Sequence, residues 1–93
     1  MERKLILSLK EEWYRMIGSG VKTEEYRELK GYWDKRLSKE YDTIEFTLGY
    51  PKKGDEGKRM KFKWGGIRVG LGNPIWGAPN YSVYILKLGE RIK

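Results

Sequence analysis

Three charged side chains follow a glycine turn at short spacing: Lys22, Glu25 and Arg27. If residues 23–29 are extended, Glu25 and Arg27 share one face of the strand and can pair. Such a pair positions the guanidinium for a planar carbonyl or a phosphate, and its carboxylate accepts from an amide or a nucleobase N–H. Partial desolvation would make the Lys22 amine either a base or an anion contact. The plainer alternative is a surface ion cluster worth about 0–1 kcal/mol.

The composition limits what other chemistry is available. The chain has no Cys and no His. This excludes disulfides, thiolate or imidazole metal sites, and nucleophile pairs that depend on histidine. We therefore expect no metal and no cofactor, and any reaction must use Lys, Arg, Asp, Glu, Tyr, Ser or Thr.

A basic stretch in the second half of the chain is the other candidate site. Residues 1–47 contain ten basic and ten acidic side chains, whereas residues 48–93 contain ten and three, so the whole net charge of +7 arises there. Clustered cations favour a polyanion partner, although a basic surface also keeps a small domain soluble. Alternate residues of one strand lie about 6.6 Å apart, which suits an extended phosphate backbone. The expected nucleic-acid contacts are Lys52, Lys53, Lys58, Arg59, Lys61, Lys63 and Arg68.

Aromatic residues provide possible stacking surfaces for bases. Tyr32, Tyr50 and Trp76 are the expected stacking residues, whereas the positions of Trp13 and Trp64 in their elements predict a core location. Two prolines restrict the loop 72–80, which we expect to border the cleft and to place Trp76 beside the cations. The alternative is that Trp76 folds back and closes the open end of the barrel.

The elements that must position these residues are short. A strand over residues 5–7 is followed by a capping box at residues 8–11, which predicts a helix beginning at Ser8 and ending in the glycine-rich residues 18–20. Its apolar stripe consists of Leu9, Trp13, Met16 and Ile17. Residues 23–29 are then expected to be extended, and residues 31–37 to form a second helix.

From residue 43 the apolar period changes to two, typical of strands. A half-buried strand over residues 43–48 and a charged loop over 52–58 precede a further strand, in which Met60, Phe62 and Trp64 alternate with Arg59, Lys61 and Lys63. At Gly65 and Gly66 the alternation shifts by one residue, which predicts a β-bulge after which Ile67, Val69 and Leu71 continue the apolar face. Residues 81–88 are apolar on both faces, as in an interior strand. The expected fold is α+β: one domain over residues 1–93, a small curved barrel of five to six strands with two short helices.

The order of these motifs resembles the ASCH domain family of the PUA-like superfamily. Its pattern after the first helix, Gly-x-Lys-x-x-x-x-Arg, is matched by Gly20, Lys22 and Arg27, and the resemblance extends to the closing residues 81–89. It is most like the short single-domain members from bacteria and phages. The resemblance implies a PUA-like barrel that binds nucleic acid, with RNA favoured, or a nucleotide in a cleft beside the lysine turn. The expected ligand-binding residues are Gly20, Lys22, Thr23, Glu25, Tyr26, Arg27 and Trp76.

Some similar proteins are amidohydrolases that deacylate N4-acetylcytidine, with a Lys and a Thr three residues later in the active site, and a distal Glu. Lys22 matches that lysine, Glu25 stands at the threonine position, and no acidic residue lies between Glu56 and Glu90. Hydrolysis, with Lys22 as base or nucleophile and Glu25 handling the proton, is therefore the alternative function. A third possibility is an accessory protein that binds another protein through exposed aromatics. No apolar run has the length of a membrane span or a signal peptide, so we expect a cytoplasmic protein without membrane contact, and a monomer.

Overall fold

The computed structural model describes all 93 residues, with five strands in one sheet. The strands are β1 (Lys4–Leu9), β2 (Glu24–Arg27), β3 (Thr43–Leu48), β4 (Arg59–Gly70) and β5 (Val83–Arg91). The helices are α1 (Glu11–Gly18) and α2 (Gly31–Leu37), and single 3-10 turns occur at Glu56–Lys58 and Pro74–Trp76. The sheet order is β1-β3-β4-β5-β2, with β1 and β3 parallel and all other neighbours antiparallel.

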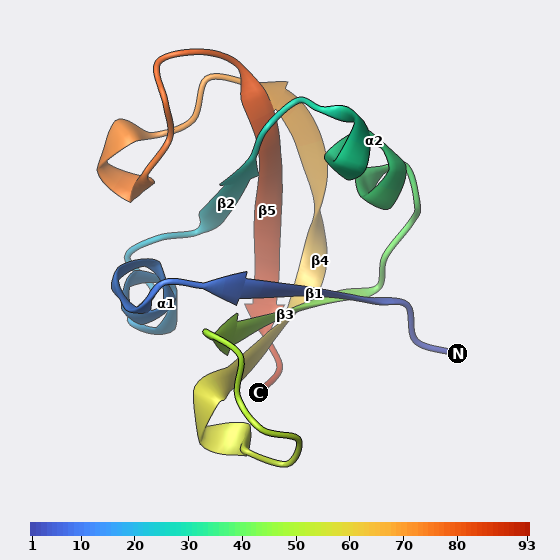
Figure 1. Ribbon diagram of the computed structural model, residues 1–93, viewed down its shortest axis with the longest axis vertical. Helices are drawn as coiled ribbons and strands as arrows, with labels where there is room; N and C mark the ends of the chain where they lie inside the picture. Colours follow the sequence, from blue (N-terminus) through green and yellow to red (C-terminus); the bar gives the residue numbers. More distant parts are fainter.

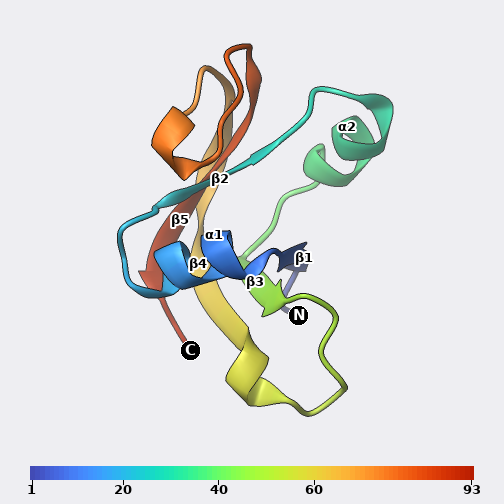
Figure 2. The same ribbon diagram turned by 60° about the vertical axis from the view of Figure 1, so that its left-hand side comes forward.

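The sheet curls into an open half-barrel (Figures 1 and 2), which confirms the expected α+β fold with a curved sheet and two short helices. Its two edge strands, β1 and β2, do not pair with each other. Helix α1 connects these edges, and α2 follows β2 on the way to β3 (Figure 1). The opening between the edge strands is therefore flanked by both helices. Neither helix has the length and apolar character needed to cross a membrane.

Apolar side chains form two clusters on opposite faces of the sheet, because the neighbours Ile85 and Leu86 of β5 belong to different ones. The larger cluster fills the inside of the half-barrel with Leu5, Leu7, Leu9, Ile17, Leu37, Ile44, Phe46, Met60, Phe62 and Leu86. The smaller one, on the outer face, consists of Tyr26, Ala78, Val83 and Ile85, so the loop carrying Ala78 packs against the back of the sheet. This packing holds that loop beside β2.

The expected β-bulge is confirmed at Gly65 and Gly66. The pairing of β4 with β5 shifts register on both sides of Trp64, and Gly66 has a φ of 106°. A Cβ at Gly65 would lie 2.6 Å from the carbonyl oxygen of Lys87, so the strands approach too closely for any side chain there. The bulge therefore bends β4 and allows the sheet to curl.

The predicted start of the first helix is wrong. Ser8 and Leu9 belong to β1, where they pair with Thr47 and Leu48 of β3. The helix begins at Glu11, and its N-terminal capping residue Lys10 makes no side-chain cap hydrogen bond. Pairing with β3 satisfies the backbone of residues 8 and 9 and buries Leu9, so tertiary structure overrides the local capping pattern.

Two predictions of burial also need correction. Strand β3 is buried on both faces, not on one, because it lies between β1 and β4 and the side chains of Lys4 and Arg59 extend to its Glu45. After the bulge, the apolar residues expected to continue the core are exposed: Ile67, Val69 and Leu71 are 37%, 56% and 65% exposed. In Figure 1 this end of β4 extends beyond the place where β1 and β3 pass across the strand.

Candidate functional site

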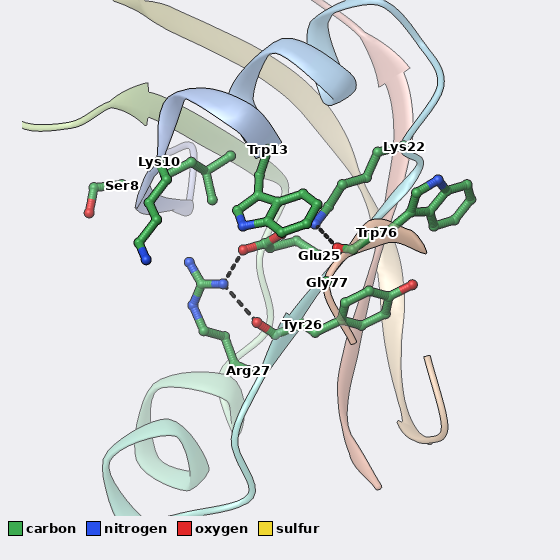
Figure 3. A pocket seen from close by; sticks show the side chains of 10 residues that line it. Ser8, Lys10, Trp13, Lys22, Glu25, Tyr26, Arg27, Trp76 and Gly77 are labelled. Carbon is green, nitrogen blue, oxygen red and sulfur yellow. Dashed lines mark hydrogen bonds and ion pairs between the residues drawn. The ribbon is translucent and has the colours of Figure 1, made fainter. Parts of the chain in front are cut away.

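A cleft of about 250 Å³ lies at the opening between β1 and β2 (Figure 3). It is lined by Ser8, Leu9, Lys10, Trp13, Lys22, Glu25, Tyr26, Arg27, Trp76 and Gly77. The three charged residues singled out from the sequence thus converge on one cleft. They are brought there by the turn after α1 and by β2, where Glu25 and Arg27 alternate with Tyr26.

Lys22 is one of the most deeply buried residues, with 2% of its surface exposed. Its Nζ donates to the carbonyl oxygen of Trp76 at 2.5 Å and lies 2.8 Å from Oε1 of Glu25. The same ammonium lies 4.6 Å from the ring centroid of Trp13 and 5.3 Å from that of Tyr26, a position of favourable cation–π attraction. Lys22 therefore joins α1, β2 and the loop 72–80 through one buried charge. The alternative of a surface ion cluster is excluded by this burial.

Glu25 binds two cations with its two oxygens. Oε1 faces Lys22, and Oε2 accepts from Nη1 of Arg27, which also donates to the carbonyl oxygen of Tyr26 at 2.7 Å. The Arg27 guanidinium lies 5.2 Å from the ring centroid of Trp33. One nitrogen of Arg27 is thus occupied within the protein, while its other two are turned toward Lys10 in Figure 3. The arginine is held in place before any ligand binds.

The hydroxyl of Tyr26, a residue that lines the cleft, connects β2 to the loop 72–80. The hydroxyl donates to Oε1 of Glu24 at 2.9 Å and accepts from the backbone N–H of Asn73 at 3.0 Å. Burial raises the pKa of Tyr26 to about 12. Two of the expected ligand residues, Gly20 and Thr23, do not line the cleft. Gly20 has a φ of 85° and forms the turn after α1, and the carbonyl of Thr23 accepts from the N–H of Leu88.

The loop 72–80 borders the cleft as expected, but Trp76 does not present its ring there. Its carbonyl oxygen faces the cleft and accepts from Lys22, whereas its indole points to the opposite side (Figure 3) and packs against the outer cluster. The alternative, in which Trp76 folds back and closes the open end of the barrel, is also wrong, because the indole packs against the outer cluster on the back of the sheet. The aromatic wall of the cleft is instead Trp13, whose ring lies so close to Gly77 that a Cβ there would be 2.9 Å from Cζ2.

Outside the loop 72–80, sequence reasoning thus missed four residues of the cleft: Ser8, Leu9, Lys10 and Trp13. The capping pattern places Ser8 and Lys10 at a helix start, and helical spacing places Trp13 in the core. Trp13 does pack partly against the inner cluster. Its additional position in the cleft wall depends on where the loop 72–80 lies, and the sequence of α1 alone cannot predict that.

The basic stretch lies outside this cleft, and most of its cations face carboxylates. The ion pairs are Lys58 with Asp55, Arg59 with Glu45 and Glu56, Lys61 with Glu2, Lys63 with Glu90, and Arg68 with Glu24, at 2.7 to 3.9 Å. Lys52 and Lys53 are exposed and have no carboxylate partner. Much of the local positive charge of this surface is therefore balanced within the protein.

The cleft brings together groups that can bind a ligand. Glu25 is its sole carboxylate, and the structure contains no group of three or more side chains suited to hold a metal ion. The cleft offers a carboxylate acceptor beside a guanidinium donor and an indole ring, all fixed by contacts within the protein.

Comparisons with protein-family models, with curated proteins and with solved structures found no match for this chain.

Proposed function

We propose that this chain is a nucleic-acid-binding module, with RNA the favoured partner, that holds one base in the cleft between β1 and β2. The observation that carries the proposal is the fixed pair of Glu25 and Arg27 at the cleft wall. Each carboxylate oxygen has two acceptor positions, so Glu25, which lines the cleft with 5% of its surface exposed, keeps acceptor capacity after binding Lys22 and Arg27. A nucleobase N–H matches the acceptor that Glu25 keeps, and the two nitrogens of Arg27 that Glu25 does not bind are donors for an adjoining carbonyl or phosphate.

An aromatic wall supports the same ligand. Trp13 lines the cleft, and stacking of a base on an aromatic ring contributes about 1–3 kcal/mol whatever the base. The cation of Lys22 lies at this ring and the backbone of Gly77 lies close to it, so the indole is held in one orientation. A planar ring is therefore a better fit than a flexible aliphatic ligand.

The phosphates would meet the cations that the protein leaves unpaired. Half of the 20 Lys and Arg side chains form ion pairs with carboxylates. Lys10 lines the cleft and forms none, and Lys52 and Lys53 add free charge on the loop before β4. The resemblance of Gly20, Lys22 and Arg27 to the ASCH pattern supports the same assignment.

Hydrolysis of a modified nucleoside is the less favoured function. It requires Nζ of Lys22 to reach an acyl carbon, yet Lys22 is 2% exposed and its Nζ donates to Trp76 and Glu25. We therefore expect N4-acetylcytidine incubated with the protein to release no more cytidine than with the Lys22→Ala variant, as measured by chromatography. Release by the unaltered protein alone would overturn this preference.

The binding proposal is tested with a fluorescent single-stranded RNA and measurement of its anisotropy at low salt. Arg27→Gln should weaken binding at least about fivefold, because losing a charge-assisted hydrogen bond to the ligand costs about 1 kcal/mol or more. The matched control is Arg15→Gln, since Arg15 is exposed on α1, pairs with Glu11 and does not line the cleft. Absence of RNA binding at low salt, or equal affinity of the two variants, would overturn the proposal.

A further inference from the structure

A second cleft adjoins the first one and shares two residues with it. It has a volume of about 360 Å³ and lies between β1 and α2. Its lining consists of Ile6, Leu7, Ser8, Arg27, Tyr32, Trp33, Arg36, Thr47 and Tyr50. Ser8 and Arg27 line both clefts, so these residues mark the junction between them.

The second cleft is rich in aromatic surface. Tyr50 is 94% exposed and Tyr32 is 61% exposed, unusually open positions for large rings in a small protein. Trp33 lies close to two cations, with its ring centroid 5.2 Å from the Arg27 guanidinium and 5.3 Å from that of Arg36. Arg36 donates to the carbonyl of Ile6 and to the Tyr32 hydroxyl but has no carboxylate partner. This cleft therefore combines stacking surfaces with an unbalanced positive charge.

The junction itself is suited to an anion. Two nitrogens of Arg27 are turned away from Glu25 and toward Lys10 (Figure 3). Lys10 is exposed and unpaired, and the Ser8 hydroxyl makes no hydrogen bond within the protein. A tetrahedral anion at this point would accept from a hydroxyl and a guanidinium and would lie beside an ammonium, which are charge-assisted contacts. A phosphodiester has this shape and charge and also carries a base on each side.

We propose that the two clefts bind successive nucleotides of one single strand, with the phosphodiester at Ser8, Lys10 and Arg27. One base would lie against Trp13, and the next against Tyr32, Trp33 and Tyr50. The two volumes, about 250 and 360 Å³, lie just below and at the small end of the roughly 300–1,000 Å³ of ligand pockets, so each suits one ring system. The inference rests on the proposed function for the first base and adds that the ligand is a strand, not a free nucleoside.

The experiment compares a ribonucleoside monophosphate with a dinucleotide, using the indole N–H resonances of the four tryptophans. Trp13 reports the first cleft and Trp33 the second, while Trp64 lines neither and serves as an internal control. We expect the dinucleotide to shift both reporters and to bind at least about tenfold more tightly, since a second stacked base contributes about 1–3 kcal/mol. A deoxydinucleotide in parallel shows whether the 2′-hydroxyl contributes.

Tyr50→Ala should abolish the gain of the dinucleotide while leaving monophosphate affinity unchanged. Tyr50 is nearly fully exposed, so folding should not be affected. Two matched controls, Tyr81→Ala and Lys35→Gln, alter an exposed tyrosine and a cation of α2 outside both clefts and should keep the gain. A dinucleotide that binds no better than the monophosphate, or leaves Trp33 unshifted, would overturn the two-cleft inference alone. If neither ligand nor a longer RNA shifts Trp13, the proposed function itself fails.

Discussion

Glu25 is a single buried carboxylate placed between two cations, so its removal leaves both Lys22 and Arg27 without a partner. Removal of Lys22, in contrast, leaves Glu25 paired with Arg27. Breaking a buried ion pair from one side costs about 3–5 kcal/mol. We expect Glu25→Gln to lower the free energy of unfolding by about that amount and Lys22→Met to lower it by less. Urea denaturation measures both, and an equal or reversed order would contradict this charge arrangement.

Gly77 combines a left-handed backbone with close contact to Trp13. Its φ is 94°, and a Cβ would lie 2.9 Å from the indole. Gly77→Ala should therefore lower the free energy of unfolding by more than the about 1–2 kcal/mol of a left-handed residue. Gly49→Ala is the control, because Gly49 has a φ of 63° but nothing within 4 Å of its added Cβ. Thermal unfolding of the two variants compares them, and a smaller loss at Gly77 than at Gly49 would disprove the contact with Trp13.

The raised pKa of Tyr26 makes the free energy of unfolding depend on pH in the alkaline range. Burial raises its pKa from 10.0 to about 12, so the native state keeps the phenol proton after the unfolded state has lost it. This contribution is complete below pH 10 and is lost as the pH rises toward 12, at about 1.4 kcal/mol per pH unit. Urea denaturation between pH 9 and 11.5 should show a shallower decline for Tyr26→Phe than for the unaltered protein. Parallel declines would refute the assigned pKa.

The charged residues of the site could be predicted from their spacing, but their burial could not. Glu25 and Arg27 lie two apart on a strand, which places them on one face in any register. Lys22, however, is buried by Trp13 of α1 and by the carbonyl of Trp76, which lies 54 residues further along the chain. The sequence around Lys22 does not indicate where the loop 72–80 lies. It therefore cannot distinguish an exposed charge cluster from a buried one.

At the scale of elements, predictions succeeded where the local pattern agreed with the neighbouring strands. Helix α2 has the predicted bounds, and strand β3 spans the predicted residues. The capping box at Ser8 failed because a parallel partner, β3, extends β1 by pairing with those residues. That partner strand begins 35 residues after Ser8. The local sequence alone therefore cannot show that strand pairing is preferred to a helix cap at this position.

The bulge of β4 gives a test of how the sheet curls. Gly65→Ala would bring a methyl group within 2.6 Å of the Lys87 carbonyl, so β4 and β5 must separate there. We expect a loss of at least about 1–3 kcal/mol and faster amide hydrogen exchange on both sides of the bulge. In Gly57→Ala the nearest atom is 3.7 Å away, and this control should be close to neutral. Unchanged exchange in Gly65→Ala would mean that curvature does not depend on this close approach.

At the scale of the whole molecule, the distribution of charge along the sequence shows where basic residues are in excess. It does not show which of these cations lack a carboxylate partner. The carboxylates that balance Lys61 and Lys63 come from Glu2 and Glu90, near the two ends of the chain. Counting charges along the sequence separates such partners, whereas folding brings them together. The sequence therefore predicts a basic stretch whose available charge only the structure reveals.

Two double variants with the same change of net charge test this distinction. Lys10→Gln with Arg36→Gln removes unpaired cations at the clefts, whereas Lys61→Gln with Lys63→Gln removes cations that already have carboxylate partners. The first should weaken RNA binding more and lower the salt slope by about 0.7 for each phosphate that the variant no longer neutralises. Anisotropy titrations over a range of salt concentrations measure both quantities. A larger effect of the Lys61 and Lys63 double variant would contradict this prediction and would indicate that the phosphates contact β4.

The contacts of Arg27 with Glu25, the Tyr26 carbonyl and Trp33 have a consequence for the entropy of binding. An arginine side chain that is free in solution loses up to about 2 kcal/mol of rotamer freedom when it is ordered by a ligand. Arg27 has given up that freedom on folding, whereas Lys10 remains exposed and keeps it. One fixed donor beside a mobile one is suited to set the register of a strand with the first and to follow its backbone with the second.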